Sequence, residues 1–138
     1  MKKILSLIEE NYSLWEVLVA RALIHSDTIK FNILYHLTKE DEEFLQGLGG
    51  SVTEGVRSDK FYATSKIVVF SSKEIEQKMI EFLKNFGYWK NKFIEDPSFW
   101  KQNEEILASI THEELVMVEF EYFSDLLENV DLYNITSS

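Results

Sequence analysis

Three histidines and 24 acidic residues are the side chains with which this 138-residue chain could perform acid–base or metal chemistry. The histidines are His25, His36 and His112, and none has the i,i+4 histidine partner of a zinc-binding helix. The chain has no cysteine, which excludes thiolate zinc sites, cysteine nucleophiles and disulfide scaffolds. No pair of carboxylates is singled out by its spacing. We therefore expect no metal, no cofactor and no enzymatic activity.

The glycine-bearing stretch at residues 47–60 is the place to look for phosphate binding. Gly47-Leu48-Gly49 begins the pattern Gly-x-Gly-x-x-Gly, but Val52 replaces the third glycine. Gly50 and Gly55 have the spacing of a Walker loop, but Val56-Arg57 replaces its Lys-Ser/Thr. We interpret residues 49–60 as a flexible loop.

The acidic side chains are distributed very unevenly along the chain. Residues 1–94 contain 13 acids and 13 bases, whereas residues 95–138 contain 11 acids and one base, Lys101. The whole net charge of −10 therefore arises in the last 44 residues. A pI near 4.7 argues against direct binding of nucleic acid or of an anionic membrane, since both require a basic surface.

Residues 112–131 carry most of this acidic charge, and two structures compete for them. Over residues 116–122, Val116, Val118, Phe120 and Tyr122 alternate with Met117, Glu119 and Glu121, as in a strand. A helical period of about 100° per residue instead gathers the apolar residues on one side and the acids on the other. We predict the helix and keep the strand as the alternative. The predicted acidic face consists of Glu113, Glu114, Glu121, Asp125, Glu128 and Asp131.

Like charges on one helix face repel each other, and acids near the C-terminal end oppose the helix dipole. The predicted acidic face is therefore not explained by stability. It is either a solvated face that keeps the protein soluble or a docking face for a basic partner. Trp89 and Trp100, in an aromatic-rich stretch of the chain, are candidate exposed anchors of such an interface.

The N-terminal half of the chain mixes the helical and strand periods. Residues 3–10 look helical, and the capping-box spacing of Ser13 and Glu16 predicts a helix to about residue 24. Alternation of apolar and polar residues, broken only at Leu34, predicts a strand over 29–37. Thr38-Lys-Glu-Asp41 resembles a capping box and opens a short helix.

Further along, residues 61–70 are the second strand candidate, and the apolar stripe from Ile75 to Phe86 predicts a helix that Gly87 ends. Asp96-Pro97 is a standard helix start and predicts a helix over 98–109. The fold class expected is α+β: a helix-rich single domain, residues 1–138, with a small antiparallel sheet. An all-α bundle is the alternative.

In size, acidity, absence of cysteine and the predicted acidic face, the chain resembles the small acidic immunity proteins that bacteria pair with nuclease toxins, including those of contact-dependent growth inhibition. The resemblance implies an inhibitor that binds and neutralises a basic toxin in the cytoplasm. No apolar run approaches the ~20 residues that span a bilayer, which agrees with a cytoplasmic protein.

Two other functions remain open. One is another protein-binding, regulatory or anti-defence module, although a phosphate mimic would spread its carboxylates over more of the chain. The other is a small enzyme that uses a carboxylate with His36 or His112.

Overall fold

The computed structural model describes residues 1–33, 37–55, 65–84, 94–110 and 113–134. The strands are β1 (Lys2–Ser6), β2 (Thr28–Ile33), β3 (Ser51–Gly55), β4 (Ser65–Ser71), β5 (Ile94–Lys101), β6 (Glu104–Ile110), β7 (Leu115–Glu119) and β8 (Tyr133–Asn134). The helices are α1 (Tyr12–His25), α2 (Lys39–Gly47) and α3 (Gln77–Lys84). Short 3-10 turns span Glu9–Asn11, Phe120–Tyr122 and Ser124–Leu126.

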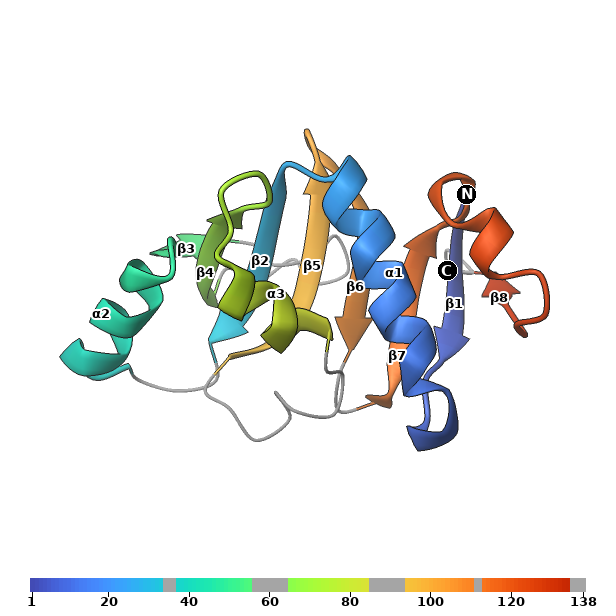
Figure 1. Cartoon of the computed structure of the whole chain (residues 1–138), viewed down its shortest axis with the longest axis horizontal. Helices are drawn as coiled ribbons and strands as arrows, with labels where there is room; N and C mark the ends of the chain where they lie inside the picture. Colours follow the sequence, from blue (N-terminus) through green and yellow to red (C-terminus); the bar gives the residue numbers. More distant parts are fainter. Residues whose placement is uncertain (34–36, 56–64, 85–93, 111–112, 135–138) are drawn as a thin grey trace.

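All eight described strands form one antiparallel sheet in the order β3-β4-β2-β5-β6-β7-β1-β8. Helices α1 and α3 lie over one face of this sheet, and α2 lies at its β3 end (Figure 1). The prediction of a helix-rich domain with a small sheet is therefore wrong, and so is the all-α alternative. The protein is an α+β fold built on a large sheet.

The core lies between the sheet and the two helices that cover it. Along β2, Ile29, Phe31 and Ile33 alternate toward this core, as the two-residue strand period requires. Trp15 on α1 is fully buried in the same core cluster, and its indole N–H donates to the Leu83 carbonyl oxygen of α3 at 2.6 Å. One side chain thus joins the two helices above the sheet.

Several local predictions are confirmed. Helix α1 forms close to the predicted place, but it begins at Tyr12 with Asn11 as its N-cap and no side-chain cap, so the predicted Ser13 capping box does not form. Strand β2 covers residues 29–33 of the candidate 29–37, whose residue 37 is not in the strand, and β4 covers residues 65–70 of the candidate 61–70. Thr38 and Asp41 form the predicted capping box: the Asp41 N–H donates to the Thr38 hydroxyl, and the Thr38 N–H donates to the Asp41 carboxylate. Helix α3, Gln77–Lys84, forms within the predicted 75–86 stripe but begins two residues later than its first apolar residue, Ile75.

Three predicted helices are wrong because the residues belong to the sheet. Residues 3–10 begin as β1, which pairs with β7 and β8. Residues 98–109 are the β5–β6 hairpin, which turns at Gln102 with a φ of 57°. Residues 115–119 are β7, so the strand alternative was the correct one there.

The predicted loop at residues 49–60 is also partly wrong. Residues 51–55 form the edge strand β3, and residues 56–60 lie outside the described residues.

Gly50 marks a close approach between the end of α2 and the sheet. Its N–H donates to the Leu45 carbonyl oxygen at 2.8 Å. A Cβ there would lie 2.7 Å from Val68 Cγ2 and 2.9 Å from Phe70 Cζ. We expect Gly50→Ala to lower the free energy of unfolding by about 1–2 kcal/mol in urea denaturation, because these buried side chains must shift. Gly47→Ala is the control, since a Cβ at Gly47 meets no described atom within 4 Å; equal losses in both variants would contradict the close approach.

Candidate protein-binding surface

The acidic C-terminal segment, residues 113–131, is not the continuous helix that the sequence predicts. It runs through β7 and two 3-10 turns, so its six predicted site residues do not share one helix face. The segment nevertheless contacts α1 near the start and near the end of that helix. Near the start of α1, the Tyr12 hydroxyl lies 3.5 Å from Oε2 of Glu114; near its end, the His25 and Tyr122 rings lie 5.2 Å apart.

Arg21 on α1 fixes the middle of the acidic C-terminal segment. Its two terminal nitrogens donate to the two carboxylate oxygens of Asp125, each at 2.8 Å, and one of them also donates to the Tyr122 carbonyl oxygen at 2.9 Å. The Arg21 guanidinium lowers the pKa of Asp125, and Asp125 in turn raises the pKa of Arg21. This bidentate ion pair holds the segment against α1 and neutralises the charge of Asp125, one of the predicted docking residues.

Glu119 and Glu121 are partly neutralised as well, because both carboxylates contact the α-ammonium group of Met1. The hydrogen bond from the Met1 ammonium lowers the pKa of Glu121 to about 2. The same ammonium also favours ionised Glu119, but burial outweighs it and raises the pKa of Glu119. Glu121 is exposed and is therefore a surface charge, whereas Glu119 is buried.

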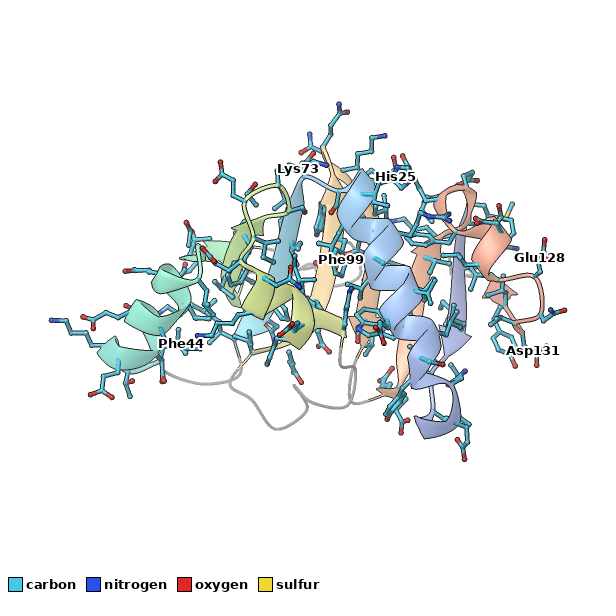
Figure 2. The ribbon with its side chains drawn as sticks, in the orientation of Figure 1. His25, Phe44, Lys73, Phe99, Glu128 and Asp131 are labelled. Atoms are coloured by element: carbon cyan, nitrogen blue, oxygen red, sulfur yellow. The ribbon has the colours of Figure 1, made fainter. Side chains whose placement is uncertain are left out.

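Three of the predicted site residues are exposed acids that form no ion pair with any residue the structure describes: Glu113, Glu128 and Asp131. Figure 2 places Glu128 and Asp131 at the rim of the molecule beyond β8. Residues 113–134 include seven acids and no lysine or arginine. The acidic charge is therefore located at one end of the sheet and beside α1, but on turns rather than on a helix.

Trp100, one of the two tryptophans proposed as exposed anchors, does not take that role. Trp100 is only 7% exposed and lies on the opposite face of the sheet, turned away from α1 and α3. Its indole N–H donates to the Ser98 hydroxyl at 2.9 Å, and the Lys30 ammonium lies 4.2 Å from the ring centroid. Trp89 lies outside the described residues.

Strand register brings further polar side chains to the same opposite face. Asn32 lies across from Glu95, and Trp100 lies across from Glu105. Both glutamates are buried, Glu105 completely, and both have interaction partners within the molecule. With Asp96 and Glu119 also buried, four of the 11 acids in the C-terminal region contribute nothing to the exposed acidic surface. The sequence alone could not show which of the 11 acids are buried and which are exposed.

One feature of the surface was missed by sequence reasoning: α1 is apolar on its outer side as well as on its inner side. Its inner face buries Trp15, Leu18, Val19 and Ala22. On the outer side, Val17 is 45% and Ile24 67% exposed. The signal was available, because Glu16 and Arg21 are the only acidic or basic residues of a 14-residue helix apart from its terminal histidine.

The described residues offer little for other chemistry. They contain no group of three or more His, Asp or Glu side chains placed to hold a metal ion. His25 packs against Tyr122, whereas His36 and His112 lie outside the described residues. No helix in the described part of the chain is long and apolar enough to cross a membrane.

Comparisons with known proteins return no match: no protein-family model, no curated protein and no solved structure is significantly similar to this chain.

Proposed function

We propose that this protein is an immunity protein that binds a basic toxin in the cytoplasm, most simply a nuclease, and neutralises it through the acidic C-terminal segment. The observation that carries the proposal is the exposed acidity of residues 113–131, which contain no basic residue and which include Glu113, Glu128 and Asp131, three exposed acids without an ion pair to any described residue. This arrangement suits a basic partner because complementary charge accelerates association and rejects acidic competitors.

Nucleases provide such a basic partner, since they bind phosphate through clefts lined with lysine and arginine. An acidic protein surface can occupy a cleft of this kind or bind beside it. The even charge balance of residues 1–94 favours one localised docking surface over a phosphate mimic spread across the whole molecule.

The test uses the toxin domain expected from the reading frame directly upstream. We expect a tight one-to-one complex whose affinity falls steeply between low and physiological salt. Glu113→Lys, Glu128→Lys and Asp131→Lys combined should weaken binding by about a hundredfold at low salt, measured by surface plasmon resonance, mainly through slower association. These three acids are preferred over Asp125, whose reversal would also break the contact with Arg21.

The control has the same change in net charge at the other end of the sheet: Glu40→Lys, Glu43→Lys and Glu54→Lys, all exposed acids on α2 and β3. We expect this variant to bind within about threefold of the wild type and to keep inhibiting the toxin. Salt-independent binding, or equal losses in both triple variants, would overturn the proposal. An upstream reading frame without a basic toxin domain would overturn it as well.

A further inference from the structure

Helix α1 exposes apolar side chains along its outer side. Val17, Ala20 and Ile24 are all exposed and follow the i, i+3, i+7 spacing that places residues on one side of a helix. We call these three residues the α1 stripe. A helix packed on a sheet ordinarily turns polar residues outward, so this stripe exposes apolar surface that folding of the chain does not require.

The α1 stripe is rigidly mounted. On the inner side, Trp15 is fully buried and hydrogen-bonded to α3, so the helix cannot rotate without breaking the core. On the flank, Arg21 is hydrogen-bonded to both Asp125 and the Tyr122 carbonyl oxygen. At about 1.5 Å per residue, the stripe from Val17 to Ile24 provides an apolar edge roughly 10 Å long on a helix of roughly 21 Å. A preformed edge of this kind loses little conformational entropy on binding.

The acidic C-terminal segment borders the α1 stripe near both ends of the helix. Glu16 is exposed on α1 itself, and Glu114 lies beside Tyr12 near the start of the helix. Asp125 is paired with Arg21 in the last half of α1, and the Lys73 ammonium donates to the Ile24 carbonyl oxygen at 3.1 Å. At the end of α1, the His25 ring lies 5.2 Å from the Tyr122 ring of the acidic C-terminal segment. An apolar centre with a polar, charged rim is the usual organisation of a protein–protein interface.

We infer that the α1 stripe is the apolar centre of the interface with the basic partner, and that the acidic C-terminal segment forms its rim. The inference rests on the proposed function and adds the chemistry of the partner's site. That site is a cleft with an apolar floor, into which Val17, Ala20 and Ile24 insert, bordered by lysine and arginine side chains. Charge complementarity argues against a second copy of this chain as the occupant, because the acidic rims of two copies would repel each other.

The experiment separates the stripe from the rim by kinetics. Val17→Ser and Ile24→Ser combined change no charge, and both positions are exposed, so the fold should be retained as judged by circular dichroism. We expect dissociation from the upstream-encoded toxin domain to become at least thirtyfold faster, while the association rate and its salt dependence stay within twofold of the wild type. Phe44→Ser is the matched control, because Phe44 is an exposed apolar residue on α2, at the other end of the sheet (Figure 2).

The outcomes distinguish this inference from the proposed function. If the wild-type protein does not bind the toxin domain, the proposed function fails. If it binds and the charge reversals weaken it, but the serine variant dissociates at the wild-type rate, only the present inference fails. Concentration-dependent dimerisation of the wild type, lost in the serine variant, would assign the α1 stripe to a second copy and would likewise overturn the inference.

Discussion

Replacing Trp15 with alanine lowers the free energy of unfolding by about 3–5 kcal/mol, the usual range for truncating a large buried aromatic side chain. Trp15 is fully buried in α1 and packs edge-on against Phe99 of β5, with ring centroids 6.4 Å apart. Its N–H also provides a hydrogen bond to the Leu83 carbonyl oxygen near the end of α3. The substitution therefore creates a cavity between both helices and the sheet and removes the donor from a carbonyl group.

Urea denaturation followed by circular dichroism measures this loss without relying on tryptophan fluorescence. Trp15→Phe keeps most of the apolar volume but cannot donate the hydrogen bond, so we expect an intermediate loss of about 1–3 kcal/mol. Val17→Ala is the control on the same helix, since Val17 is half exposed and its truncation should cost well under 1 kcal/mol. A Trp15→Ala variant as stable as Val17→Ala would contradict the role of Trp15 as the link between α1, α3 and the sheet.

The sequence correctly predicted the helices and strands whose formation depends on residues close together in the chain. The capping box at Thr38 needs only residues 38 to 41, and it forms as the sequence predicts. The strand β2 was recognisable because one of its faces is apolar and the other is polar, so its alternation is complete.

The β5–β6 hairpin was hidden for the opposite reason. Every residue of β5 from Ile94 to Trp100 is buried, so burial on both faces removes the alternation that marks a strand. Asp96-Pro97 imitated a helix start, but the register of β5 against β2 is irregular between Lys30 and Asn32, and Asp96 has a φ of 54°. A bulge is a place where a strand tolerates proline, which explains how a helix signal occurs inside a sheet.

The acidic C-terminal segment was recognised in the sequence by its charge, but its secondary structure was predicted wrongly. The predicted helix matched the wheel over many residues, whereas the strand signal covered only a few. Strand β7 is nevertheless stabilised on both sides, by pairing with β6 and with β1. Pairing with strands that are distant in the sequence does not affect the local periodicity of apolar residues, so it could not be predicted from that periodicity. The contact between Arg21 and Asp125 joins residues more than a hundred positions apart and was equally invisible.

Asp27 is the second position where we expect a large loss of stability, because it connects three parts of the sheet. Its N–H donates to the Trp100 carbonyl oxygen at 2.8 Å, and its own carbonyl oxygen accepts from the Ser72 N–H at 3.0 Å. Its carboxylate accepts from the Gln102 N–H at 2.6 Å and from the Thr28 hydroxyl at 2.7 Å. The carboxylate therefore holds the β5–β6 turn against the start of β2.

We expect Asp27→Ala to lower the free energy of unfolding by about 2 kcal/mol at neutral pH, because two hydrogen bonds to an ionised acceptor are lost and water replaces them only in part. Asp27→Asn keeps the shape and one acceptor oxygen, so its loss should be about half as large. Urea denaturation at constant salt measures both. Glu74→Ala, at an exposed position in the turn that precedes α3, is the control and should change stability by less than about 0.5 kcal/mol.

The pH dependence identifies the ionised carboxylate of Asp27 as the cause. The hydrogen bond from the Gln102 N–H, followed by that from Thr28, lowers the pKa of Asp27 below its ordinary value of 3.8. A carboxyl group whose pKa is lowered by folding stabilises the fold above its ordinary pKa, and this contribution is lost as the pH falls through the lowered value. The stability difference between the wild type and Asp27→Asn should therefore be constant above about pH 5 and should shrink progressively below about pH 4. A difference that stays constant to about pH 2 would show that the stabilisation comes from the shape of the side chain and not from its charge.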